Sequence, residues 1–238
     1  MERKSHTIKF LVALALTFTL LVAIVPPRAD AQGAGLVSSI INKMERNRQD
    51  LRSLRSGIKM EKYNAQIKDA DYYVGDVIYQ PGAGRNASVR VDWQKPQRET
   101  LAVTEGKYKL FRPRLNMAYV GSTSSKNSKV SGVLGFGLNI SGAQLRNNFE
   151  VPQIIGEGTL DNGGPHVTWL KLVPKGNASY KHAEIWVETS TGMPLQTKVV
   201  EKNGDSTTVR LINPQRNARL STDEFQLKLP SDVKIVNG

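Results

Sequence analysis

The stretch that decides the fold is residues 75–120, which read GDVIYQPGAGRNASVRVDWQKPQRETLAVTEGKYKLFRPRLNMAYV. Apolar and polar residues alternate along it with a period of two, so Val89, Val91 and Trp93 face one side of a strand and the residues between them face the other. Turn signals containing glycine or proline recur about every ten residues. This pattern predicts a meander of antiparallel strands, whose apolar face must be covered by another part of the chain or by a ligand.

Segments with strand-like patterns continue on both sides of this stretch. Residues 58–80 alternate loosely around a polar turn at residues 66–71, which predicts two strands. After residue 151 the pattern returns, and Asn203-Gly204 is a good signal for a two-residue hairpin turn. The later strands are predicted at residues 167–173, 183–188, 195–201, 207–212 and 225–230. The chain is therefore expected to be mostly β, with about ten to eleven strands.

One long helix is predicted ahead of the sheet, at residues 33–55. Its apolar residues recur at helical spacing, and Gly57 is suited to end it because glycine accepts left-handed backbone geometry. The apolar stripe consists of Ile40, Met44, Leu51 and Leu54, with Val37 and Ile41 beside it. We expect this stripe to cover the sheet. A different face carries Arg48, Arg52 and Arg55, for which two alternatives stay open: solvent, or anionic lipid head groups.

A second apolar segment, at residues 133–149, interrupts the series of strands. It is rich in glycine up to Ser141, which is a suitable N-cap for a following helix. The apolar residues before that point are Leu134, Phe136, Leu138 and Ile140. The segment is either a loop packed on the core or a pliable lid, because apolar loops rich in glycine suit opening motions.

Residues 1–31 have the parts of an export signal. A basic start is followed by an apolar run at residues 10–25, and Ala29-Asp30-Ala31 fits the small-residue cleavage rule. The alternative is an uncleaved membrane anchor, but the run is shorter than the roughly 20 residues that a spanning helix needs. Cleavage near Ala31 would leave residues 32–238 as a single periplasmic domain. It would lower the net charge from +12 to +10, since the removed segment holds four basic and two acidic residues.

The composition narrows the class of function. A net charge of +12 and a pI of about 9.9 predict an anionic partner, and export argues against nucleic acid. The chain has no cysteine, so it forms no disulfide and no thiolate metal site. Beyond the signal only His166 and His182 remain, without metal-type spacing, and neither a Gly-x-Ser-x-Gly elbow nor a phosphate loop is present. We expect no cofactor, no metal and no enzymatic activity.

Several short motifs resemble the periplasmic outer-membrane lipoprotein carrier (LolA/LolB-like) family. They are Gly75-x-Val77-x-Tyr79, Arg85 with Pro96 eleven residues later, Glu105-Gly106 before Tyr108–Phe111, Leu170-x-Leu172-x-Pro174-Lys175, and Phe225-x-Leu227-x-Leu229-Pro230. The resemblance implies an α+β, mostly β fold, in which a half-open antiparallel barrel is covered by the N-terminal helix and the apolar lid. It also implies that Arg85 takes part in ligand handling. This sequence departs from the family around Arg85, where an extra Pro-Gly-Ala-Gly precedes the arginine.

The resulting hypothesis is a periplasmic carrier for the acyl chains of lipoproteins or for another lipid. The cavity is expected to be lined by Val89, Val91, Trp93, Leu101 and Val103 on the sheet and by Leu134, Phe136, Leu138 and Ile140 on the lid, each of which has plain core packing as its alternative. Arg85 is expected to tie the lid shut by donating hydrogen bonds to lid carbonyls, and so to assist release, and its alternative is an exposed surface arginine. The implied partners of this monomer are an inner-membrane donor, an outer-membrane acceptor and a transient anionic membrane surface. Two rivals remain: an envelope-stress sensor of the same fold that binds a partner protein, and a secreted hydrolase with an unfamiliar site.

Overall fold

The computed structural model describes residues 28–82, 87–123 and 138–237, with side chains from residue 35 onward. Its elements in chain order are α2 (Arg28–Asp50), β1 (Leu54–Asn64), β2 (Asp69–Gln80), β3 (Ser88–Lys95), β4 (Glu99–Thr104), β5 (Lys107–Arg112), η1 (Pro113–Leu115), β6 (Met117–Ser122), α3 (Gly142–Asn148), β7 (Gln153–Thr159), β8 (His166–Leu172), β9 (Tyr180–Glu188), β10 (Pro194–Glu201), β11 (Ser206–Arg216), η3 (Thr222–Phe225) and β12 (Lys234–Asn237). The predicted mostly β fold class is confirmed, with twelve strands instead of ten or eleven.

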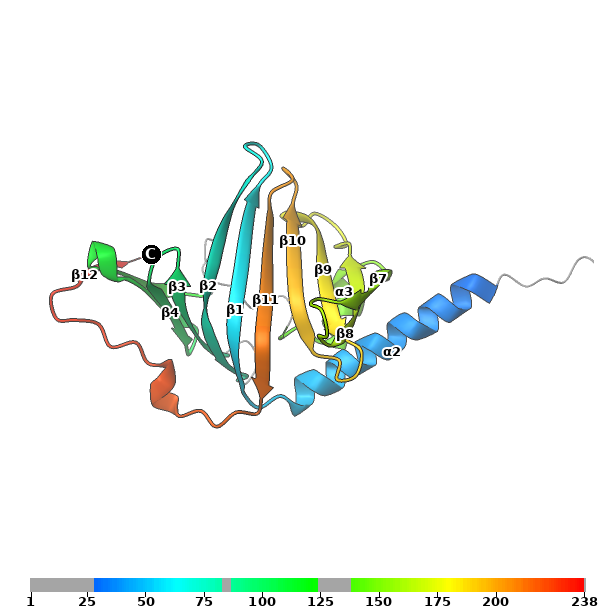
Figure 1. Ribbon diagram of the computed structural model, residues 1–238, viewed down its shortest axis with the longest axis horizontal. Helices are drawn as coiled ribbons and strands as arrows, with labels where there is room; N and C mark the ends of the chain where they lie inside the picture. Colours follow the sequence, from blue (N-terminus) through cyan, green and yellow to red (C-terminus); the bar gives the residue numbers. More distant parts are fainter. Residues whose placement is uncertain (1–27, 83–86, 124–137, 238) are drawn as a thin grey trace, which may run out of the picture. The chain divides into compact units, whose positions relative to one another are not determined.

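All twelve strands form one open sheet in the order β12-β6-β5-β4-β3-β2-β1-β11-β10-β9-β8-β7 (Figure 1). Neighbouring strands are antiparallel except β12, which pairs in parallel with β6. The outermost strands β12 and β7 do not pair with each other, so the sheet is not closed into a full barrel. The β4–β5 hairpin shows how local sequence makes the meander: Glu105 and Gly106 both have positive φ, of 50° and 72°, as a two-residue hairpin turn requires.

Helix α2 ends earlier than the sequence predicted. It stops at Asp50, while Leu54 and Arg55 already belong to β1, so the expectations of a helix to residue 55 and of a stop at Gly57 were wrong. Leu51 and Leu54 are spaced for a helical stripe and are both buried, which is why the pattern misled us. Pairing of Leu54 with Tyr79 of β2 and Arg216 of β11 overrides the local helical preference.

The second helix follows its predicted signal. Ser141 caps α3 through a capping box, in which its side chain accepts from the backbone N–H of Gln144 and the Gln144 side chain accepts from the backbone N–H of Ser141. The strand predicted at residues 225–230 was wrong, because Phe225 ends the short helix η3 and its side chain is buried. The last strand lies further on, in β12.

One face of the sheet carries both hydrophobic clusters, and we call it the inner face. The register pairs Val209 of β11 with Thr197 of β10, and Thr197 with Ile185 of β9, so these residues share a face. On it, α2 and α3 pack through Val37–Met44, Leu145 and Phe149 against β8 and β9. The opposite, outer face is crossed by the segment after β11, because Arg90 of β3 donates to the carbonyls of Glu224 and Gln226.

Candidate functional site

The inner face of β2 to β5 is the apolar surface that the sequence singled out. Val77, Val91, Leu101 and Leu110 are successive cross-strand partners, so one apolar row runs across four strands. A second row beside it begins with Tyr79 and Val89 and continues through Val103 to Tyr108. Antiparallel partners lie close enough for their side chains to touch, so the two rows form a continuous apolar surface.

Most of the predicted cavity residues come together on this surface. Val91, Trp93, Leu101 and Leu138 are buried members of one cluster, and Val89 and Val103 pack against it while staying partly exposed. Ile140 instead packs with the cluster beneath α2 and α3. Leu134, Phe136 and Arg85 lie outside the described residues, so their roles stay predictions.

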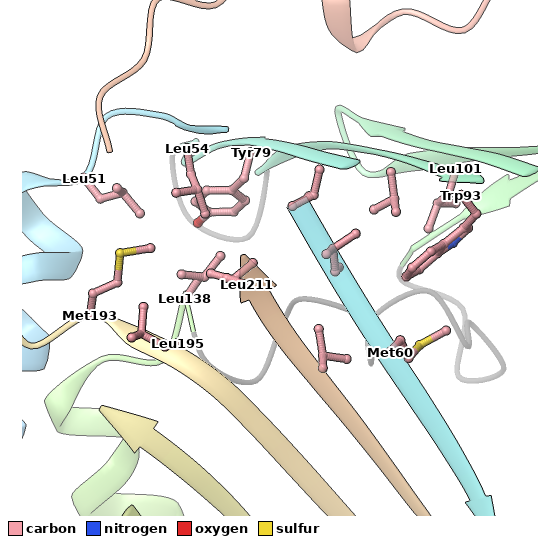
Figure 2. Close-up of a cluster of buried hydrophobic side chains, with 14 of the residues drawn as sticks. Leu51, Leu54, Met60, Tyr79, Trp93, Leu101, Leu138, Met193, Leu195 and Leu211 are labelled. Atoms are coloured by element: carbon pink, nitrogen blue, oxygen red, sulfur yellow. The ribbon is translucent and has the colours of Figure 1, made fainter. Parts of the chain in front are cut away.

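The cluster also contains residues that were not among the predicted cavity residues. Figure 2 shows Leu51, Leu54 and Tyr79 facing Met193, Leu195 and Leu211, with Leu138 among them. The first three lie between the end of α2 and the start of β1 and at the end of β2, whereas Met193 comes from the β9–β10 connection and Leu195 from the start of β10. Alternation from Val77 pointed to Tyr79, but nothing local to Met193 links it to a surface so distant in sequence.

Aromatic and charged side chains border the apolar surface where β3 ends. Tyr73 meets Trp93 edge-on, with ring centroids 5.7 Å apart, and Lys62 Nζ lies 5.2 Å from the Tyr73 ring centroid. Burial, followed by the nearby carboxylates, raises the pKa of Tyr73. Arg112 pairs with Glu99 at 3.0 Å. The apolar surface thus ends at Trp93, whose cross-strand partner Glu99 already belongs to the charged border.

Helix α2 is tied to α3 by the carboxylate of Glu45. It accepts from Arg48 Nη2 at 2.6 Å and from the backbone N–H of Gly142 at 2.9 Å. Hydrogen bonding from Arg48, assisted by the bonds from Gly142 and Gln49, lowers the pKa of Glu45 to about 2, although burial opposes the shift. Gly142 is the first residue of α3, so this contact holds the end of the predicted lid segment against α2.

The outer face has a cleft of about 540 Å³ between η3 and strands β1, β2, β3 and β11. Arg55 donates to the Glu224 carboxylate at 2.5 Å, and Arg90 donates both to Asp92 and to the backbone carbonyl of Glu224. These ion pairs join the segment after β11 to the sheet. Arg48 and Arg55 therefore do not form the free basic face that the sequence left open, because each is paired with a carboxylate.

The described residues offer little for metal or acid–base chemistry. They contain no group of three or more His, Asp or Glu side chains placed to hold a metal ion. His182 contacts Glu184 at 2.9 Å, and His166 is exposed. No helix in the described ranges is long and apolar enough to cross a membrane. What the described residues do offer is the apolar inner face with its charged border.

Comparison with known proteins identifies a family for this chain and solved structures with a similar fold. The model of the outer membrane lipoprotein carrier protein LolA family matches residues 84–228. The fold is similar to an uncharacterised conserved protein from Thermus thermophilus, with a TM-score of 0.53 at 14% identity over 84% of this chain and 98% of that one. No curated protein matches the sequence.

Two further solved structures share the fold. MucB gives a TM-score of 0.55 at 12% identity over 85% of this chain. The Pseudomonas aeruginosa MucA/MucB complex gives 0.50 at 14% identity over 81% of this chain. This chain spans 66% and 61% of those two chains, so it is shorter than both. At such low identities the likeness concerns the fold alone.

Proposed function

This chain belongs to the family of the outer membrane lipoprotein carrier protein LolA, and from that premise we propose that it is a periplasmic carrier for acyl chains. The cargo is a lipoprotein or another lipid, which the carrier binds on its inner face and delivers to the outer membrane. The observation that carries the proposal is the continuous apolar surface across β2 to β5, which keeps partly exposed side chains at Val89, Val103, Tyr108 and Leu110.

The half-buried side chains are where a bound acyl chain gains most. Val91 is fully buried by the protein itself, so it contributes packing in the free state. A bound ligand would cover the apolar area that Val89 and Val103 still expose to water. Each methylene removed from water contributes roughly 0.8 kcal/mol to the free energy of binding. Contacts of this kind have no direction, so the same surface accepts different acyl chains and releases them without breaking specific hydrogen bonds.

Export is part of the same proposal. Residues 1–31 act as a cleaved signal, and the mature chain begins at Gln32 as a single carrier domain in the periplasm. Helix α2 begins at Arg28, so cleavage removes its first residues and leaves the stretch that packs on the sheet, Val37–Met44, intact. The carrier works as a monomer between an inner-membrane donor and an outer-membrane acceptor, without catalysis or a cofactor.

Native mass spectrometry of the mature protein tests the carrier function. We expect co-purifying acyl chains and saturable binding of a fluorescent fatty acyl probe. Val103→Glu should weaken probe binding at least tenfold, because it sets a charge against hydrocarbon. Thr104→Glu is the matched control, since the neighbouring residue points to the outer face. Equal probe binding by both variants, with circular dichroism unchanged, would remove the inner face from ligand binding.

A second function within the fold is an envelope regulator that binds a partner protein. The similarity to MucB, which is solved in a complex with MucA, favours it as the main rival. The same mass spectra separate the two functions: a stoichiometric protein partner without lipid supports the regulator, and acyl chains support the carrier.

A further inference from the structure

One end of the sheet gathers positive charge and exposed apolar tips. The β3–β4 turn, the β5–β6 turn and the start of β12 lie at this end, and strands β3 to β6 and β12 are neighbours in the sheet (Figure 1). We call residues 95–98, 112–116 and 232–235 the turn surface. They contain five cations, Lys95, Arg98, Arg112, Arg114 and Lys234, and a single carboxylate, Asp232.

The apolar tips of the turn surface are held outward by a defined backbone. Leu115 and Ile235 are each 57% exposed, and η1 buries none of its residues. Asn116 ends η1 in the left-handed conformation, its side chain donates to Asp232 at 2.9 Å, and its carbonyl accepts from the backbone N–H of Lys234. Leu115 therefore faces solvent because its turn is fixed, not because the turn is loose.

The cations of the turn surface are free to meet an anionic partner. Arg112 pairs with Glu99, but Lys95, Arg98, Arg114 and Lys234 are exposed and form no ion pair within the described ranges. Asp232 is engaged by Asn116. Four cations of the turn surface thus have no ion pair within the described ranges, and such an excess of positive charge favours an anionic partner.

The turn surface also adjoins the apolar inner face. Trp93, a buried member of the inner cluster, pairs across the strands with Glu99, the partner of Arg112. A ligand that leaves the inner face past Trp93 therefore reaches the turn surface directly. The charged border described above is the boundary between the two.

We propose that the turn surface docks on an anionic lipid bilayer, with Leu115 entering the boundary between head groups and acyl chains and the four free cations binding lipid phosphates. The inference rests on the proposed carrier function, since a carrier of acyl chains must meet membranes. An aliphatic tip surrounded by Lys and Arg is typical of interfacial membrane binding. A protein partner is disfavoured, because the turn surface has no aromatic residue to anchor one and its apolar tips are aliphatic, a type under-represented among interface hot spots.

Co-sedimentation of the mature protein with lipid vesicles tests the docking. Vesicles of phosphatidylcholine alone are compared with vesicles of equal parts phosphatidylcholine and phosphatidylglycerol. We expect preferential binding to the anionic vesicles, weakened by salt. The double variant Arg98→Gln/Arg114→Gln should bind them about 25-fold more weakly, since each cation near such a surface gives about a fivefold gain. Leu115→Ala should lower binding by at least about tenfold.

Matched control variants test whether the loss of vesicle binding is specific to this end of the sheet. Arg52→Gln/Lys107→Gln removes two exposed cations from the opposite end, and Ile155→Ala removes an exposed aliphatic side chain from β7. Both should bind anionic vesicles as the parent does, and all variants should keep acyl-probe binding in solution without vesicles. A parent that binds no acyl probe but still docks would refute the carrier function alone. Equal binding to both vesicle types, equal loss in the control variants, or Leu115-dependent capture of a protein without vesicle binding would overturn the docking proposal.

Discussion

Glu45→Gln is the most direct probe of how the helices are held over the inner face. The substitution keeps the shape of the side chain but removes the charge that accepts from Arg48 and from the backbone N–H of Gly142. The pKa of Glu45 is lowered from 4.5 to about 2 in the folded protein. Because this pKa is lowered on folding, the carboxylate stabilises the fold above pH 4.5, and the contribution is lost as the pH falls from 4.5 towards 2.

The magnitude of this effect is bounded by the structure. A carboxyl with this change in pKa would contribute about 3 kcal/mol to the free energy of unfolding at neutral pH. The Glu45 side chain is 26% exposed, and its pair with Arg48 lies within one helix, so solvent and local contacts in the unfolded chain reduce that figure. We expect Glu45→Gln to lower the free energy of unfolding by about 1–2 kcal/mol at neutral pH.

Urea denaturation across the acid range measures the effect, with hydrogen exchange to locate it. The difference between the parent and Glu45→Gln should disappear near pH 2, and exchange at neutral pH should accelerate in α3 more than in the sheet. Glu157→Gln, on exposed β7, is the control and should cost little. The reasoning fails if Glu157→Gln destabilises as much, or if the Glu45→Gln deficit is the same at acid and neutral pH.

Three further predictions concern other parts of the chain. Gly192 has φ of 75°, and an added Cβ would overlap the backbone of Lys43 in α2. Gly192→Ala should therefore lower the free energy of unfolding, measured by urea denaturation, by more than about 2 kcal/mol. The control Gly176→Ala, at φ of 71° with open space around it, should lower it by only about 1 kcal/mol. Mass analysis of the exported protein should give a soluble mature form starting at Gln32, and an intact Met1 in the membrane fraction would contradict this. Arg85→Leu should keep cargo uptake but slow hand-over to an acceptor roughly ten- to a hundredfold; transfer at the parental rate would take Arg85 out of release.

Local patterns predicted the strands better than they predicted where elements meet. Period-two alternation identified β3 and placed Val91 and Trp93 on the same face, because a strand's geometry alone fixes that relation. The boundary between α2 and β1 was wrong because Leu51 and Leu54 satisfy helical spacing and are buried either way. Only the pairing of Leu54 with two distant strands decides between helix and strand, and that pairing leaves no local signal.

The segment after β11 was misjudged for a related reason. The alternation from Phe225 to Leu229 suits an edge strand, but the backbone carbonyls of Glu224 and Gln226 bind Arg90 instead of a neighbouring strand. Phe225 is buried as the last residue of η3. The side chain of Arg90 thus supplies hydrogen bonds that a neighbouring strand would otherwise supply. The hydropathy pattern of the segment does not reveal this arrangement. The same limit hid Met193 and Leu195 from the predicted site, since the β9–β10 connection and the start of β10 lie more than ninety residues after Trp93.

Burial on the inner face changes along the order of the strands. Over β8 and β9 the face is filled by α2 and α3, and Leu170 and Ile185 beneath the helices are fully buried, as is Leu145 of α3. Over β3 to β5 the same face keeps half-buried side chains such as Val103 and Tyr108. Substitutions under the helices should therefore change the free energy of unfolding, whereas under the proposed carrier function substitutions of half-buried residues such as Val103 and Tyr108 should change ligand affinity.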